Sequence, residues 1–241
     1  MADEILVRSS GRATEIVLNR PDAGNGVTNE MAAALGQAIA EAAESHFIVL
    51  RGAGEDFCTG RAVMGARPAG RPAAYERRAQ NEVIFECYGA FRRSPVPVVG
   101  VVQGRALGFG CALASLCDIT LASTAATFQL PEMGHNIMPT MAMSSLVDRV
   151  PRKALMYLTY STRAIDAEKA LSFGIVSDVV PPEGLEARVA ELREALEKAP
   201  RPAILAVKEY ARSALSMDIA SAVGFARNLH ATVNSAPQLR G

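Results

Sequence analysis

The sequence predicts an α/β fold, and two observations support that prediction. Apolar runs typical of buried strands alternate with segments of helical periodicity over most of the chain. From residue 181 onward the pattern is almost wholly helical. With 241 residues, of which 49% are hydrophobic, the chain is long enough to bury one large core. We therefore expect a core of residues 1–186 followed by a helical region of residues 187–241.

The first half of the chain predicts two paired strands, a helix, a third strand and a second helix. Alternating apolar residues indicate the paired strands, and a turn at Ser10 and Gly11 separates them. The first helix is expected to begin near Thr28, because Thr is a preferred N-cap residue. The segment 65–93 combines a loop rich in Gly, Pro and Arg with the second helix, and we interpret this loop and helix as a cover over a site. The predicted elements are residues 4–9, 13–19, 28–45, 46–52 and 75–91.

The second half predicts a strand, a turn into a helix, another strand and then three helices. Gly104, Gly108 and Gly110 lie between the apolar strand and the helical stretch. Asp118 follows this helix, and we interpret it as a brace for the next strand. Proline residues and Asp218 separate the C-terminal helices. The predicted elements are residues 96–102, 108–117, 118–123, 183–199, 202–215 and 218–233.

Composition and charge argue against several classes of function. The 25 Lys and Arg residues balance 25 Asp and Glu residues, so we expect no binding to nucleic acid or to an anionic membrane. Gly104 and Arg105 interrupt the longest apolar stretch, and residues 1–10 lack a charged-then-apolar leader, which predicts a cytoplasmic protein without a membrane span. The cysteines lack metal-binding spacing, so we expect buried, reduced thiols and no metal site. They are Cys58, Cys87, Cys111 and Cys117.

The glycines of the stretch VVQGRALGFGCALASLCDI, residues 101–119, have two interpretations. A glycine turn from a strand into a helix presents unpaired N–H groups, and the helix dipole adds positive partial charge, so the turn can stabilise an anion. Alternatively, the glycines let a helix pack closely on a sheet. The spacing matches neither GxxxxGK[ST] nor GxGxxG, which argues against a phosphate-binding loop.

Two further stretches favour a catalytic site. Residues 54–63 follow a predicted strand, and there Gly60 precedes the N–H group of Arg61. Glu132 lies between Pro131 and Met133 in an otherwise apolar segment. Apolar surroundings disfavour the charged form of a carboxyl group, so we expect the pKa of Glu132 to rise toward the range useful for proton transfer.

Five stretches, in their order and spacing, resemble the crotonase superfamily, which is the enoyl-CoA hydratase/isomerase family. They are LNRPDAGNGV at 18–27, FCTGRAV at 57–63, PVPVVGVVQGRALGFGCALASLCDITLAS at 95–123, FQLPEMG at 128–134 and AEKALSFGIVSDVVP at 167–181. The resemblance covers most of residues 5–185 and implies a crotonase-like spiral of ββα turns. The helical tail fits the family's trimerisation region.

The resemblance implies an enzyme that acts on acyl-CoA thioesters and assembles as a trimer or hexamer. Coenzyme A is then part of the substrate, and no separate cofactor is expected. In the family, two backbone N–H groups bind the thioester oxygen as it becomes an enolate, and the matching donors here are those of Arg61 and Phe109. The matching substrate-binding positions are Gly60, Gly108, Gly110 and Ala112.

The carboxylates indicate the reaction type. Family hydratases commonly carry two glutamates; Glu132 matches one of them, and Ala112 stands at the position of the other. Hydration divides water activation and proton delivery between two carboxylates, whereas one base suffices for a 1,3-proton shift. With Glu132 as the proton-transfer residue, we therefore expect isomerase-like chemistry in preference to efficient hydration.

Two departures from the family keep alternatives open: the pair Arg61-Ala62, and the stretch HNIMPTMAMSS at 135–145 in place of the family's usual glycine-rich segment. Arg61 and Ala62 stand where the family often has Ala-Asp, and the Arg61 side chain either points to solvent or binds a carboxylate or phosphate of the substrate. His135 follows Glu132 by three residues and either is structural or serves the same pocket. One alternative is a crotonase-like hydrolase of a thioester or a 1,3-diketone that recruits His135 or Arg61. The other is a non-catalytic scaffold or an RNA-binding relative.

Overall fold

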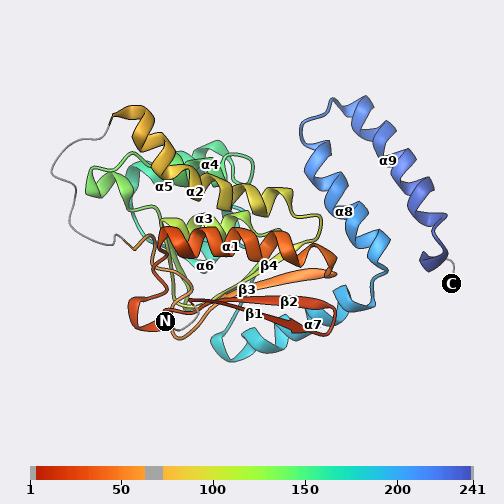
Figure 1. The fold of residues 1–241 in the computed structure, drawn as a ribbon, viewed down its shortest axis with the longest axis horizontal. Coiled ribbons are helices and arrows are strands. Elements are labelled where there is room, and N and C mark those ends of the chain that lie inside the picture. Colours follow the sequence, from red (N-terminus) through yellow and green to blue (C-terminus); the bar gives the residue numbers. More distant parts are fainter. Residues whose placement is uncertain (1–3, 63–72, 240–241) are drawn as a thin grey trace.

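A six-stranded sheet forms the centre of the protein (Figure 1). The computed structural model describes residues 4–62 and 73–239. The strand order is β1-β2-β3-β4-β6-β9; β1 and β2 are antiparallel, and all other neighbours are parallel. The strands are β1 Ile5–Ser10, β2 Ala13–Leu18, β3 Phe47–Gly52, β4 Val98–Val102, β6 Ile119–Ser123 and β9 Asp178–Val180.

Short second segments follow the strands of this sheet and pair with one another. β5 (Arg105–Leu107) follows β4 and pairs in parallel with β7 (Thr127–Gln129), which follows β6. β8 (Ile165–Asp166) completes this small sheet. Earlier in the chain, isolated parallel β-bridges make the same kind of contact: Cys58 pairs with Ala106 of β5, and Val27 pairs with Arg61. The chain therefore winds as a spiral in which a turn contributes a long strand, a short second segment and a helix.

Helices cover both faces of the large sheet. They are α1 Asn29–Glu41, α2 Ala74–Arg93, α3 Phe109–Leu116, α4 Thr140–Leu146, α5 Arg152–Ser161, α6 Ala167–Ser172, α7 Leu185–Lys198, α8 Arg201–Ala214 and α9 Ile219–Asn234. Figure 1 shows α1, α2 and α3 over one face and α7 under the other. Because β3 is buried on both faces, its sequence reads as one continuous apolar run.

The first helix begins where the sequence predicts. Thr28 Oγ1 accepts a hydrogen bond from Met31 N–H at 3.1 Å, so Thr28 is the N-cap of α1. Met31, Leu35 and Ile39 are four residues apart and form the buried face of the helix. The α-helix ends at Glu41, earlier than predicted, because the chain tightens into a 3-10 turn there.

The four cysteines are buried and unpaired, which confirms the prediction from their spacing. Burial raises the pKa of the Cys58, Cys87 and Cys111 thiols to about 12. Burial also raises the pKa of the Cys117 thiol. These thiols therefore stay protonated near neutral pH.

The C-terminal helices divide into one that packs on the sheet and two that project. α7 places Leu185 and Val189 against the apolar face of the large sheet. α8 and α9 pack on each other, with the Tyr210 and Phe225 rings 5.8 Å apart, and they project from the core (Figure 1). We call α8 and α9 the C-terminal arm. The boundary predicted near residue 186 falls at the start of α7, whereas the arm begins at Arg201.

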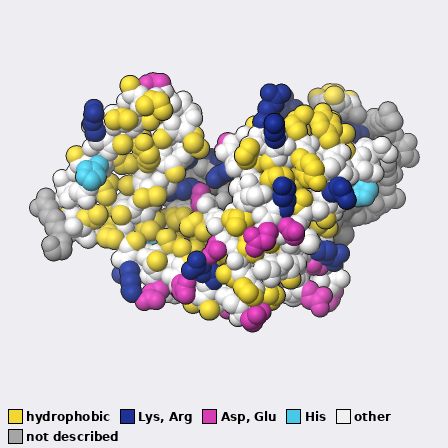
Figure 2. All heavy atoms as spheres, turned by 180° about the vertical axis from the view of Figure 1, so that it is seen from behind, with side chains coloured by type: hydrophobic (Ala, Val, Ile, Leu, Met, Phe, Trp, Pro, Cys, Tyr) yellow, Lys and Arg dark blue, Asp and Glu magenta, His cyan; other side chains and the backbone are white. Residues whose placement is uncertain are grey.

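In one isolated copy of the protein, the C-terminal arm exposes large apolar side chains to solvent. Val207, Leu215, Ile219 and Val223 are all exposed, and Ile219 is 82% exposed. Figure 2 shows hydrophobic side chains gathered over this part of the molecule.

Asp118 is structural, but its carboxylate braces the start of β4 and not the strand that follows it, and it also anchors the arm. Its Oδ2 accepts a hydrogen bond from Val98 N–H at 2.8 Å. Lys208 of α8, which is 7% exposed, places Nζ 2.6 Å from Asp118 Oδ1 and 2.5 Å from Oδ2. Arg149 Nη1 lies 3.9 Å from Oδ1. Burial lowers the pKa of Lys208, and the charge of Asp118 opposes this shift.

Some sequence predictions concern features that the structure leaves untested. The loop part of the predicted cover, residues 65–72, lies outside the described residues. Within the described ranges, no helix is both long and apolar enough to cross a bilayer. The cytoplasmic location stays a prediction. In the same ranges, no group of three or more His, Cys, Asp or Glu side chains is placed to hold a metal ion.

Candidate functional site

The segment after β3 is fixed beside β5 and beneath the start of α3. Cys58 N–H donates to Arg105 O at 3.0 Å, and Leu107 N–H donates to Cys58 O at 2.9 Å. A Cβ at Gly110 would lie 2.1 Å from Cys58 O, so only glycine fits there. Gly110 therefore allows the first turn of α3 to pack directly on the backbone of this segment.

The N–H group of Arg61 points away from the pairing that holds its neighbours. Val27 N–H donates to Gly60 O, and Ala62 N–H donates to Val27 O, both at 2.9 Å. Since N–H groups alternate in direction along paired extended backbone, the Arg61 N–H faces the other side. It has no hydrogen-bond partner in the part of the chain that the structure describes. Gly60 has a φ of +114°, which explains why glycine stands at this turn.

The N–H group of Phe109 opens α3. Gly108 is the N-cap with a φ of +51°, and its N–H donates to Gln129 O at 2.8 Å. Phe109 is the first helical residue, so its N–H has no acceptor within the helix, and none is found elsewhere among residues 4–62 and 73–239. The helix dipole adds positive partial charge at this end. The two predicted donors are thus unpaired groups on adjoining segments.

Glu132 faces the start of α3. It is the first residue of a 3-10 turn, Glu132–His135, three residues after the end of β7. Its Oε1 lies 3.0 Å from the position that a Cβ on Gly108 would occupy, so a side chain at Gly108 would crowd the carboxylate. Its Oε2 is buried and has no hydrogen-bond partner among the residues that the structure describes. Burial raises the pKa of Glu132, while its backbone N–H and the charge of His135 oppose the shift.

The remaining predicted residues lie around this point. Ala112 is one turn further along α3 and is fully buried. His135 is exposed at the end of the turn that carries Glu132. The Arg61 guanidinium donates from Nη2 to Asn29 Oδ1 at 2.6 Å, so it is directed toward the start of α1. Binding of substrate by Gly60, Gly108, Gly110 and Ala112 stays a prediction.

Sequence reasoning missed Tyr88 of α2. Its ring is 4% exposed and stacks on the Phe109 ring, with centroids 5.4 Å apart and an interplanar angle of 28°. Burial raises the pKa of Tyr88, and the charges of Cys87, Glu132 and Cys58 raise it further. In sequence, Tyr88 follows Ile84 by four residues on the apolar face of α2, and therefore it reads as core.

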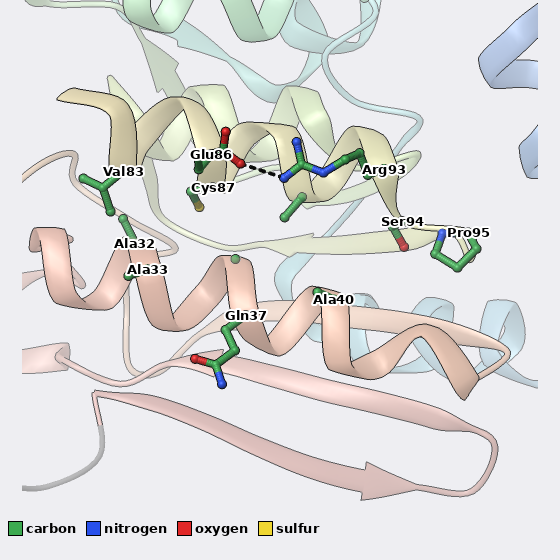
Figure 3. Close-up of a pocket in the computed structure, with 12 residues that line it drawn as sticks. Ala32, Ala33, Gln37, Ala40, Val83, Glu86, Cys87, Arg93, Ser94 and Pro95 are labelled. Carbon is green, nitrogen blue, oxygen red and sulfur yellow. Dashed lines mark hydrogen bonds and ion pairs between the residues drawn. The ribbon is translucent and has the colours of Figure 1, made fainter. Parts of the chain in front are cut away.

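A separate groove of about 540 Å³ lies between α1 and α2 (Figure 3). Its walls are mostly small or apolar, and an ion pair between Arg93 and Glu86, at 2.9 Å, lies along one side. None of the predicted site residues lines it. Cys87 lines this groove, whereas the next residue, Tyr88, stacks on Phe109.

The chain matches known sequences over nearly its whole length. Residues 9–240 match the family model described as enoyl-CoA hydratase/isomerase. A probable enoyl-CoA hydratase of Rhizobium meliloti is 31% identical over 235 residues, which cover 94% of this chain and 88% of that protein. Other similar sequences include a mitochondrial enoyl-CoA hydratase domain-containing protein 3 from rat. It is 28% identical over 213 residues, which cover 86% of this chain and 69% of that protein.

Solved structures share the fold. The structure of an enoyl-CoA hydratase from Mycobacterium smegmatis superposes with a TM-score of 0.91 at 27% identity and covers 98% of this chain and 93% of that one. A putative enoyl-CoA hydratase from Thermobifida fusca, solved in complex with CoA, superposes with a TM-score of 0.83 at 26% identity. The superposition covers 95% of this chain and 92% of that one. The predicted crotonase-like α/β fold is therefore confirmed.

Proposed function

The chain belongs to the enoyl-CoA hydratase/isomerase family, and from this premise we propose that it acts on an acyl-CoA thioester by stabilising the enolate. Coenzyme A is part of the substrate in this proposal, and no separate cofactor takes part. The family match over residues 9–240 and the similarity to a structure in complex with CoA support this substrate class.

The backbone N–H groups of Arg61 and Phe109 serve as the two donors to the thioester oxygen. The proposal is supported by their unpaired state and by the close packing of α3 on the segment that carries Arg61. Negative charge develops on that oxygen when the neighbouring carbon loses a proton. Each donor then contributes about 3 kcal/mol to the transition state.

Glu132 is the proton-transfer residue, and one observation carries this assignment. Its carboxylate oxygen Oε2 is buried without a partner beside the N-terminus of α3, where the predicted donors lie. A carboxylate that lacks partners and has a raised pKa holds a proton more readily than an exposed one, and it can also return that proton.

The chemistry favoured here is a 1,3-proton shift. The Glu132 carboxylate takes a proton from the carbon next to the thioester carbonyl, and the electrons of the broken C–H bond pass into the enolate. The same carboxyl group returns the proton two carbons away, which moves the double bond and regenerates the carboxylate. Ala112 offers no second carboxylate for water activation, so hydration is the weaker reaction.

We further propose that the C-terminal arm assembles the chain into a trimer or a hexamer. The exposed apolar side chains of α8 and α9 support this, because contact with neighbouring copies would remove them from water.

A panel of acyl-CoA substrates tests the reaction. With 3-enoyl-CoA substrates we expect a product of unchanged mass and shifted double bond, and with crotonyl-CoA only slow gain of water. Release of free CoA would instead support the hydrolase. No reaction with any thioester would favour the non-catalytic alternative and would overturn the proposed function.

A further inference from the structure

Tyr88 is the only tyrosine whose side chain is buried, and all five tyrosines are described. Its hydroxyl has no hydrogen-bond partner in the described ranges, and the oxygen itself is not fully enclosed, so it can donate to a bound molecule. Other buried hydroxyls of this protein are bonded, for example Ser94 Oγ to Val96 O at 2.7 Å. Thr159 is an exception, and it lies on α5.

The ring of Tyr88 lies at the start of α3. It stacks on Phe109, the residue whose N–H is a proposed donor. Phe109 follows Gly108, whose Cβ position lies 3.0 Å from Glu132 Oε1, and precedes Gly110, which packs on Cys58 O. Tyr88 therefore contacts the residue that carries one proposed donor, and Gly110 packs that residue's helix on the segment that carries the other.

The electrostatic neighbours of the phenol indicate the same position. After burial and the charge of Cys87, the charges of Glu132 and Cys58 raise the pKa of Tyr88, and the Arg61 guanidinium lowers it. Cys87 lies on α2, Cys58 and Arg61 lie on the segment after β3, and Glu132 lies in the turn after β7, so three separate segments surround the phenol. Because the net shift is upward, the phenol stays protonated near neutral pH and is available as a donor.

We propose that Tyr88 is a further catalytic residue, whose hydroxyl donates a third hydrogen bond to the thioester oxygen beside the N–H groups of Arg61 and Phe109. This inference rests on the proposed enolate chemistry. The phenol keeps its proton throughout, so no bond to it forms or breaks. The enolate oxygen supplies the acceptor that the Tyr88 hydroxyl lacks, and the hydrogen bond strengthens as negative charge develops there.

The variant Tyr88→Phe removes only the oxygen and keeps the ring that stacks on Phe109. Tyr75→Phe is the matched control, because it makes the same change on the same helix at a side chain that is 74% exposed. The assay measures isomerisation of a 3-enoyl-CoA and, separately, exchange of deuterium from D₂O into the carbon next to the thioester of butyryl-CoA. This exchange reports enolate formation alone.

We expect Tyr88→Phe to lower kcat and the exchange rate by about 10²-fold with little change in KM, because the donor acts mainly in the transition state. Tyr75→Phe should match the wild type, and the thermal unfolding of both variants should stay unchanged. An exchange rate of Tyr88→Phe within about twofold of the wild type, or a loss confined to KM, would overturn the role of Tyr88 alone. Absence of exchange and turnover in the wild type would overturn the proposed function and this inference together.

Discussion

Glu132 and Asp118 are both partly buried carboxylates, and their surroundings are opposite. Asp118 receives Lys208 on both oxygens, a backbone N–H on Oδ2 and Arg149 at longer range. Glu132 has a buried oxygen with no partner among the described residues, and its own backbone N–H and the charge of exposed His135 only partly oppose the rise in its pKa that burial causes. A carboxylate with every oxygen paired is held in one position, whereas a carboxylate with a buried, unpaired oxygen can exchange a proton. The difference separates a structural acid from a candidate catalytic one.

The largest expected effect is the loss of catalysis in Glu132→Gln. The amide keeps the size of the side chain but cannot accept a proton, so turnover should fall by about 10²- to 10⁴-fold. Steady-state kinetics with the best acyl-CoA of the panel measure the change, and circular dichroism checks the fold. Full activity in Glu132→Gln would contradict the assignment and direct attention to His135.

The next effect concerns the stability of the Asp118 cluster. Lys208→Met leaves the Asp118 charge partly buried without its main partner, which should lower the free energy of unfolding by about 3 kcal/mol. Denaturant titration of the variant measures this loss. Adding Asp118→Asn should recover part of the stability, because the uncompensated charge is then gone. A double variant no more stable than Lys208→Met would show that the charge is not the cause.

The C-terminal arm that Lys208 anchors offers a third test. Ile219→Asp places a charge at an apolar side chain that the proposed assembly buries, and the change should weaken association by about 2 kcal/mol per interface. Light scattering over a range of concentrations should show dissociation. Ser9→Asp adds the same charge to exposed β1 and serves as the control. A wild-type chain that is monomeric at micromolar concentration would contradict the proposed assembly.

The smallest expected effect is a pH dependence of stability. The pKa of folded Glu132 is raised above the ordinary value of 4.5 by burial, so folding favours its protonated form. Its contribution to stability is present below the unfolded pKa and is lost as pH rises through the folded pKa. Glu132→Gln stays neutral, and it should therefore gain stability relative to the wild type as pH rises above the ordinary carboxyl pKa of about 4.5. Urea titrations at several pH values check the sign; a difference that does not vary with pH would contradict it.

The sequence predicted those parts of the fold that depend on local pattern. The helix after Gly108 and the strand after Asp118 lie within one residue of their predicted bounds. The short strands β5 and β7 went unrecognised, because three residues are too few to show periodicity. Helix α7 also reads like α8, and only the fold shows that its apolar face meets the sheet.

The candidate site was predictable where a motif marks it and unpredictable where distant residues meet. Glu132 and the two donors follow from local stretches. The pair of Asp118 with Lys208 joins residues 90 positions apart, and no local pattern links them. The reason for each glycine also depends on tertiary contacts. A Cβ on Gly104 would lie 2.2 Å from Glu55 O, so glycine is required there by the close approach of another backbone segment. Gly104 and Gly110 therefore serve close packing, whereas stabilisation of an anion at this turn stays a prediction.

The buried cysteines allow local opening of the protein to be measured by chemical labelling. Cys58 lies beneath the loop of one proposed donor, Cys111 lies in the first turn of α3, and Cys87 precedes Tyr88. Alkylating reagents attack the thiolate, and a buried thiol with a pKa of about 12 becomes reactive only while its segment is open to solvent. The labelling rate of each cysteine can be measured by mass spectrometry of the peptide that contains it. This rate reports how often the segment around that cysteine opens to solvent in the absence of substrate.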